Sequence, residues 1–203
     1  MERFDLFATP VFAFRPNDVA DLNRELSKLL IAEFESSSGV RRSNIAGWHS
    51  TPDLSLREEP CYQRLMRIVV DHVHEAIGQT ARARGVALER GLRFAVHAWA
   101  MVMRDGDYTV IHDHAQAHWS VVYYVDRGDP APSARPDSGR LTLQDPRGAL
   151  SNVPGLDLFP SQFSINPSDG LLVVFPGWLQ HFVHPYRGTR PRISVSCNVR
   201  VEA

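Results

Sequence analysis

Residues 106 to 125 read Gly-Asp-Tyr-Thr-Val-Ile-His-Asp-His-Ala-Gln-Ala-His-Trp-Ser-Val-Val-Tyr-Tyr-Val, and His112 and His114 stand at its centre. In an extended strand, residues two apart point to the same side and lie about 6.6 Å apart along the chain. Regular strand geometry would therefore place both imidazoles on one face, able to converge on a metal ion, and would turn Asp113 away. The apolar and aromatic run that follows, Trp119 to Val125, is typical of a buried strand. A His-x-His pattern alone remains weak evidence, because a half-exposed strand end can carry two histidines without function.

A third histidine strengthens the metal hypothesis. The segment Gly170-Leu-Leu-Val-Val-Phe-Pro-Gly-Trp-Leu-Gln-His181 is an apolar strand, a Pro-Gly turn and then a histidine. Neutral imidazole is the commonest metal ligand among side chains. Two histidines on one strand face and a third after a strand and turn therefore indicate a metal site.

The strand predicted from Arg192 to Arg200 alternates strictly between apolar and polar residues. One face carries Ile193, Val195, Cys197 and Val199, and the other carries Arg192, Ser194, Ser196 and Asn198. Such alternation usually means that the polar face meets solvent. Here the polar face begins with an arginine and a serine, which together could hold a carboxylate through the guanidinium fork and the hydroxyl.

Four segments carry a resemblance to a known family. They are Arg42-Ser-Asn-Ile-Ala-Gly-Trp-His-Ser50, His112-Asp-His114 with Trp119-Ser-Val-Val-Tyr-Tyr-Val125, Phe175-Pro-Gly-Trp-Leu-Gln-His181, and Arg192-Ile-Ser-Val-Ser-Cys-Asn198. In these segments the chain resembles the 2-oxoglutarate/Fe(II) oxygenases of the double-stranded β-helix (jelly-roll) class, in particular an uncharacterised bacterial and phage branch. The resemblance spans most of the chain in the family's order.

The expected architecture is mostly β with flanking helices: a double-stranded β-helix buttressed by two N-terminal helices. Asn17 or Asp18 is expected to cap a helix with Leu22, Leu26 and Leu30 on one face, and a second helix is expected from Pro60 to about Arg84. From Leu92 the pattern changes to strands. We therefore expect a single domain over residues 1–203, with a helical buttress at 17–84 and a β core at 92–203.

The resemblance implies the cofactors and the site residues. It implies Fe(II) held by His112, His114 and His181, and 2-oxoglutarate as cosubstrate, bound by Arg192, Ser194 and Tyr124. The family's usual third ligand is a carboxylate at the position of His114, so this chain departs from the pattern there, and Asp113 is the second choice of ligand if the strand is broken. No catalytic residue is expected beyond the metal ligands. The candidates for a substrate pocket are Trp99, His118, Ser120 and Asn198.

The implied reaction is a dioxygenase reaction that hydroxylates a small-molecule substrate and releases succinate and CO₂, with desaturation and halogenation left open. Two alternatives remain. Gly106 to His114 fits the Gly-x5-His-x-His opening of the cupin motif, and Pro176 to His181 fits its Pro-x-Gly-x-x-His spacing except at Trp178. A cupin-type metal-dependent dioxygenase or isomerase is therefore one alternative, although the cupin glutamate ligand is absent. The other is a non-catalytic jelly-roll ligand-binding protein.

Composition narrows the class of partner and the setting. The chain has 203 residues, 43% of them hydrophobic, which is enough for one domain with a substantial core. The net charge is −1 and no basic run occurs, which argues against nucleic acid as a partner. The two cysteines form no Cys-x-x-Cys pair, and no signal peptide or membrane-length apolar run is present. We expect a reduced, cytoplasmic protein with no membrane partner, and we keep a homodimer open as its assembly.

Overall fold

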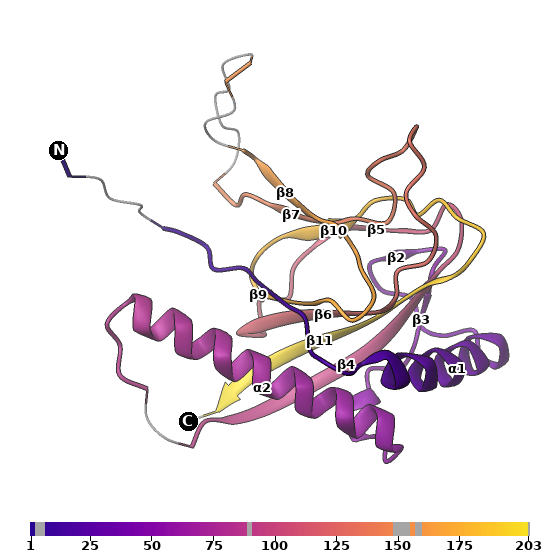
Figure 1. The fold of residues 1–203 in the computed structure, drawn as a ribbon, viewed down its shortest axis with the longest axis horizontal. Helices are drawn as coiled ribbons and strands as arrows, with labels where there is room; N and C mark the ends of the chain where they lie inside the picture. Colours follow the sequence, from indigo (N-terminus) through magenta and orange to yellow (C-terminus); the bar gives the residue numbers. More distant parts are fainter. Residues whose placement is uncertain (3–6, 89–90, 148–154, 157–159, 203) are drawn as a thin grey trace.

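The structure is a computed structural model that describes residues 1–2, 7–88, 91–147, 155–156 and 160–202. It has three layers (Figure 1). Two helices cover one face of a six-stranded antiparallel sheet, and a five-stranded antiparallel sheet faces the other side. The expected class, a jelly roll buttressed by two helices, is confirmed.

The larger sheet forms the floor of the molecule's central pocket. Its strands are, in order across the sheet, β1 (Phe12–Phe14), β9 (Leu172–Pro176), β6 (Trp119–Asp126), β11 (Arg192–Glu202), β4 (Arg93–Met103) and β3 (Trp48–His49). The central strand β11 pairs with β4 along its whole length and with β6 on the other side. Every pairing in this sheet is antiparallel.

The smaller sheet forms the opposite wall. Its strands are, in order, β2 (Asn44–Ile45), β5 (Tyr108–His112), β10 (His181–Val183), β7 (Leu141–Gln144) and β8 (Gln162–Ile165). In the pairing of β10 with β5, His181 stands directly opposite His112. The sheet therefore brings together two histidines that are far apart in the sequence.

The helices form because each presents a continuous apolar face to the larger sheet. Helix α1 (Ala20–Ser36) buries Leu22, Leu26 and Leu30, and α2 (Pro60–Ala83) starts with a proline in its first turn, as expected. A short 3₁₀ helix, η1 (Leu54–Leu56), precedes α2. The predicted cap of α1 was wrong: Val19 takes the N-cap position and no side chain caps the helix. Asp18 lies in the left-handed region, with φ of 55°, immediately before it.

The two faces of β11 have different surroundings, and this difference creates the pocket. The apolar residues Ile193, Val195, Cys197 and Val199 are buried in the core that the sheet shares with the helices. The polar residues of the other face line a pocket between the two sheets. The polar alternation therefore faces an interior pocket and not bulk solvent.

The division into a helical segment and a β core is less clean than the sequence indicated. Strands β1, β2 and β3 all precede residue 92, and two of them complete the edges of the larger sheet. Strand β10, only three residues long, was not predicted as a separate element. Within the described ranges, no helix has both the length and the apolar character needed to cross a membrane.

Candidate active site

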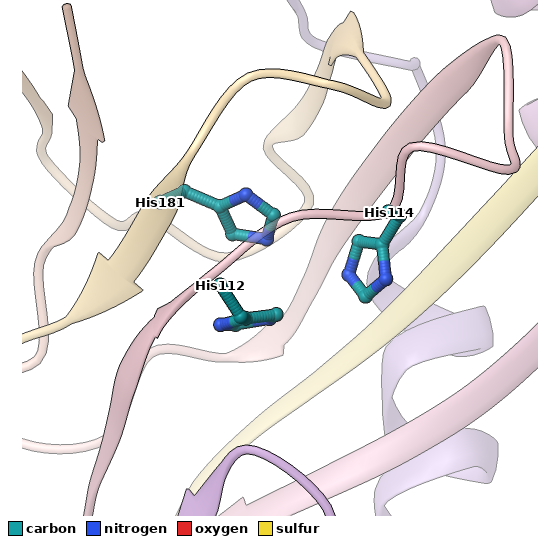
Figure 2. A group of neighbouring side chains, drawn as sticks. All are labelled: His112, His114 and His181. Atoms are coloured by element: carbon teal, nitrogen blue, oxygen red, sulfur yellow. The ribbon is translucent and has the colours of Figure 1, made fainter. Parts of the chain in front are cut away.

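Three histidines converge between the sheets (Figure 2). His112 is the last residue of β5, His181 is the first residue of β10, and His114 lies two residues beyond the end of β5. One ring nitrogen from each lies within 4.8 Å of the others. The ring centroids are 4.4 Å apart for His112 and His181, 5.1 Å for His112 and His114, and 5.2 Å for His114 and His181. The sequence predicted that these three histidines lie close together, and the structure places them close together.

Backbone carbonyls orient two of the rings. Nδ1 of His112 lies 2.8 Å from the carbonyl oxygen of Val110, and Nδ1 of His181 lies 2.8 Å from that of Leu179. A carbonyl oxygen can only accept, so each Nδ1 carries the proton and each Nε2 keeps its lone pair. This arrangement is typical of metal-binding histidines, whose second nitrogen is held by an outer partner.

His114 reaches the cluster through a turn, and the expectation of a regular strand through it was wrong. The N–H of His114 donates to the carbonyl of Gly177 at 2.8 Å, and the N–H of Gly177 donates to the carbonyl of His118 at 3.1 Å. A Cβ on Gly177 would lie 2.3 Å from the carbonyl oxygen of Ala117 and 2.8 Å from that of His114. The turn after β5 and the Pro-Gly turn before β10 therefore fit together only because residue 177 has no side chain.

Asp113 does not join the cluster. Its side chain is exposed, and its carboxylate accepts a hydrogen bond from the N–H of Ala115 at 3.2 Å. The structure therefore favours His114 over Asp113 as the third member of the group.

The cluster lies in surroundings that keep imidazoles neutral. Burial, reinforced by the neighbouring His112, lowers the pKa of His181 to about 3 and that of His114 to about 4. Burial also lowers the pKa of His112, against the raising effect of its bond to the Val110 carbonyl. Neutral imidazoles are the form that binds metal ions, so the site is prepared for a cation.

The histidines form part of the wall of a pocket between the two sheets. The floor consists of cross-strand rows on the larger sheet. Arg192 stands beside Met103, Ser194 lies between Met101 and Tyr124, and further along the sheet the strand pairing sets Ser196 beside Trp99 and Asn198 beside Ser120.

Arg192 is the largest fully buried side chain, with 1% of its surface exposed. Its guanidinium donates to the Ser194 hydroxyl at 3.2 Å and lies 3.7 Å from the sulfur of Met103. Its Nε has no hydrogen-bond partner, and no carboxylate in the described part of the chain forms an ion pair with it. Burial lowers the pKa of Arg192. A buried cation without a counter-ion is costly, so this end of the pocket is suited to an anion.

Tyr124 packs against the arginine, and Tyr186 lies near it. The guanidinium carbon lies 5.0 Å from the centroid of the Tyr124 ring, whose hydroxyl is buried without a partner. The Tyr186 hydroxyl donates to the carbonyl of Arg190 and accepts from the N–H of Asp129, each at 2.7 Å. Gly139 lies against both Tyr186 and Arg192, since a Cβ there would be 3.1 Å from the ring and 3.2 Å from the arginine side chain.

The remaining predicted pocket residues divide into two groups. Trp99, Ser120 and Asn198 line the pocket, and the Trp99 ring lies 5.6 Å from that of His114. His118 does not line it. Its side chain is exposed, and its Nδ1 accepts a hydrogen bond from the N–H of Val201 at 2.9 Å, so it caps the edge of β11.

Sequence reasoning missed two residues of the segment from Arg42 to Ser50. The Ser43 hydroxyl lies 3.3 Å from Nε2 of His112, so a metal ion on that nitrogen would replace this hydrogen bond. His49 is buried and its ring stacks on Trp99 at 5.4 Å. The segment had been singled out as a matching motif, but nothing in its pattern gave these side chains a role.

Comparison with known proteins agrees with this geometry. Residues 97–198 match the model of the family described as "Putative 2OG-Fe(II) oxygenase". No match was found among curated proteins. Among solved structures, a prolyl-4-hydroxylase from Pseudomonas putida has a TM-score of 0.62 and 20% identity, over 98% of this chain and 96% of that one.

Two further structures share the fold. The 2-oxoglutarate-dependent epimerase SnoN from nogalamycin biosynthesis has a TM-score of 0.61 and 12% identity, over 95% of this chain and 78% of that one. HygX from Streptomyces hygroscopicus, crystallised with nickel and 2-oxoglutarate, has a TM-score of 0.60 and 11% identity, over 95% of this chain and 83% of that one. At these identities the structures show a common fold, and the family model covers half of the chain. The chain therefore belongs to the family of 2-oxoglutarate/Fe(II) oxygenases.

Proposed function

We propose that this protein is a non-haem Fe(II) dioxygenase that uses 2-oxoglutarate to hydroxylate a small-molecule substrate, releasing succinate and CO₂. The observation that carries the proposal is the buried Arg192, without a counter-ion, at one end of the pocket that also contains the histidine cluster. A cation site and an anion site in one pocket match the two ligands that the family name specifies.

The histidine cluster fits a divalent metal ion of the Fe(II) type. His112, His114 and His181 would each supply one imidazole nitrogen, and three protein ligands leave coordination positions open for small ligands. Compared with two imidazoles and a carboxylate, three neutral imidazoles leave the bound ion more positive by one unit. That extra charge favours anionic ligands on the metal.

The Arg192 end fits the far carboxylate of 2-oxoglutarate. The guanidinium supplies charge and a bidentate fork, and the Ser194 hydroxyl lies 3.2 Å from it. The unpartnered hydroxyl of Tyr124, whose ring lies against the guanidinium, supplies a further donor. Nε of Arg192 and the Tyr124 hydroxyl are thus two unsatisfied donors that a bound carboxylate would complete.

When bound, iron and 2-oxoglutarate would supply the oxidative chemistry, which the side chains of the protein cannot perform alone. The protein's own contribution is to hold the three imidazoles neutral and oriented, to bind the cosubstrate and to exclude water. Apolar side chains from both sheets, including Val122, Phe175 and Val183, supply the dry wall of the pocket. The similar structures include both a hydroxylase and an epimerase. Of these two reactions we propose hydroxylation.

A crystal soaked anaerobically with Fe(II) and 2-oxoglutarate tests the proposal. We expect iron on the three histidines and a cosubstrate carboxylate on Arg192. Metal bound without 2-oxoglutarate would favour a cupin-type activity. A carboxylate on Arg192 with no metal would favour a non-catalytic binding protein.

A further inference from the structure

The described part of the chain leaves four buried side-chain atoms without a hydrogen-bond partner: Nε of Arg192, the Tyr124 hydroxyl, the Ser120 hydroxyl and Oδ1 of Asn198. An unsatisfied buried polar atom is costly unless a ligand or water completes it. The first two belong to the proposed cosubstrate end. The other two are not used by any step described so far.

Ser120 and Asn198 form a pair at the other end of the pocket floor. They stand directly opposite each other on β6 and β11, six residues along β11 from Arg192. At about 3.4 Å per residue, roughly 20 Å of strand separates the two ends. Ser120 is 3% exposed, and both side chains line the pocket. Because 2-oxoglutarate has a five-carbon chain, one molecule held by Arg192 cannot also satisfy this pair.

The pair lies next to the histidine cluster. Phe175 stands opposite Ser120 on the next strand, and its ring centroid is 4.9 Å from that of His181. On β4, Trp99 stands opposite Ser196, which is two residues before Asn198 on β11. The Trp99 ring is 5.6 Å from that of His114. A group bound by Ser120 and Asn198 would therefore lie beside the proposed metal, where a substrate has to be.

The chemistry of this end selects a group that both donates and accepts hydrogen bonds. Oδ1 of Asn198 is an acceptor without a donor, and the Ser120 hydroxyl has no hydrogen-bond partner. A carboxylate of a substrate has no N–H or O–H to donate to Oδ1 of Asn198. A hydroxyl and a carboxamide each donate and accept, so together they match a group that has both a donor and an acceptor. A carboxamide or peptide amide provides these on separate atoms, one for each protein partner.

We propose that Ser120 and Asn198 form a substrate subsite that binds an uncharged amide, either a primary carboxamide or a peptide unit, beside the metal. The inference rests on the proposed function in that it takes the Arg192 end to be filled by the cosubstrate. It names the substrate class by the hydrogen-bonding groups of the pocket: a molecule that presents an amide group.

Titration of the full chain with two matched probes tests the subsite. The probes are propionamide, which is a neutral amide, and propionate, in which a carboxylate replaces the amide group. The protein is first saturated with Zn(II) and with N-oxalylglycine, in which an N–H replaces a methylene of 2-oxoglutarate, so that metal and cosubstrate positions are filled without turnover. Probe binding is followed by saturation-transfer NMR. The same titration is repeated with the metal-free protein.

We expect wild type to bind the amide, and we expect Asn198→Leu to weaken binding of the amide more than binding of the acid, because a carboxylate has no hydrogen to donate to Oδ1 of Asn198. Ser120→Ala and Asn198→Leu should each weaken amide binding about three- to tenfold, which is the usual loss for one hydrogen bond. Both variants should keep the wild-type affinity for Zn(II) and N-oxalylglycine. Ser164→Ala, which removes a serine hydroxyl from β8 outside the pocket, should bind both probes as wild type does.

Three results would overturn the subsite. Equal amide binding in wild type and in both variants would mean that a water molecule completes the two atoms. Weaker N-oxalylglycine binding with unchanged amide binding would assign the pair to the cosubstrate. Equal weakening of amide and acid binding in Asn198→Leu would refute the selectivity for an amide. If wild type binds neither Zn(II) nor N-oxalylglycine but the metal-free chain shows the expected amide pattern, the proposed function fails and the subsite stands.

Discussion

At the scale of single residues, the state of the three imidazoles controls both metal binding and stability. An unfolded histidine titrates near 6.5, whereas in the folded protein His114 has a pKa of about 4 and His181 of about 3. Between these values the unfolded chain binds protons that the folded chain does not. The contribution of these residues to stability is therefore fully present above about pH 6.5 and is lost as the pH falls toward 4 and then 3.

This linkage predicts an acid-sensitive metal-free protein. Its urea midpoint should fall as the pH is lowered from about 7 to about 5, since the unfolded imidazoles gain protons in that range. His114→Gln, which cannot titrate, should reduce the pH dependence. A midpoint that changes equally with pH in wild type and in this variant would show that His114 does not contribute.

The same pKa shifts imply that protons compete with metal only at low pH. An ordinary histidine site loses metal near pH 6, where free imidazole gains its proton. With the lowered pKa values, iron bound at about pH 7.5 should stay bound at about pH 5.5. Anaerobic metal analysis after gel filtration at the two pH values measures this, and loss of the metal by pH 5.5 would contradict it.

His114 provides a sharp test, because a carboxylate is the family's usual residue there. His114→Ala should weaken iron binding by more than about 100-fold, since removing a ligand should exceed the 10–100-fold effect of removing an outer partner. His114→Asp should retain the metal, because it restores two histidines and a carboxylate. Iron titration of both variants decides the role. Nearly unchanged affinity in His114→Ala would mean that the metal rests on His112 and His181 alone.

Much of this residue-scale account could be predicted from the sequence. The three histidines were predicted as a group from a two-residue spacing and a strand-turn pattern, although the structure places His114 in a turn beyond β5, and Arg192 was predicted from the alternation of its strand. The contacts of Ser43 and His49 could not be predicted in this way. Ser43 lines the pocket from just before β2, and His49 stacks on Trp99 from β3, and strands of two residues are too short for a period to show side-chain direction.

At the scale of elements, two turns are fitted to each other around Gly177. Gly177→Ala should press a Cβ against the carbonyl oxygens of Ala117 and His114 and so displace His114. We expect a loss of about 1–3 kcal/mol in unfolding free energy, as for other overpacked sites, together with weaker metal binding. Urea unfolding and iron titration measure the two effects.

Gly78→Ala is the matched control for that variant. Gly78 lies within α2, and its Cβ would meet only the flexible end of Arg82 at 3.3 Å. Alanine should stabilise the helix by about 0.5–1 kcal/mol and leave metal binding unchanged. Equal behaviour of the two variants would show that close approach at Gly177 does not matter.

The long elements could be predicted from the sequence and the short ones could not. Helix α2 begins at the expected proline, and β4, β6 and β11 lie within a residue or two of their expected bounds. Strands β2, β3 and β10 have two or three residues each, too few for a hydrophobic period to show. They exist because neighbouring strands supply partners, which is tertiary information.

At the scale of the whole molecule, one continuous core joins both helices to the larger sheet. Leu26 of α1, Leu65 of α2 and Val195 of β11 belong to the same buried cluster. We therefore propose that residues 1–203 form one folding unit. Leu26→Ala should cost about 2–5 kcal/mol, by loss of contacts and a residual cavity.

Unfolding followed by two signals tests this unity. Far-ultraviolet circular dichroism reports mainly the helices, while tryptophan fluorescence reports the sheets and the loop that carry the tryptophans. In wild type and in Leu26→Ala the two curves should coincide. Helices that unfold before the sheets would show that the helical buttress is a separate unit.

Sheet order was the part of the architecture least accessible to residue patterns. Nothing in the periodicity says that β10 lies between β5 and β7, although this placement sets His181 opposite His112. The family resemblance implied only that His181 shares a metal with His112 and His114. The polar face of β11 could be found by alternation, but whether it faced solvent or a pocket depended on the second sheet.

The affinity of the iron-loaded protein for 2-oxoglutarate, followed anaerobically by the metal-to-ligand absorbance band, tests the central claim most directly. Arg192→Ala should keep its iron and lose about 3–5 kcal/mol of cosubstrate binding, or roughly two to four orders of magnitude in affinity, because the carboxylate would be buried unpaired. Tyr124→Phe should show a smaller loss in the same direction. If wild type develops no such band, or if Arg192→Ala titrates like wild type, the pocket does not bind 2-oxoglutarate in the way proposed.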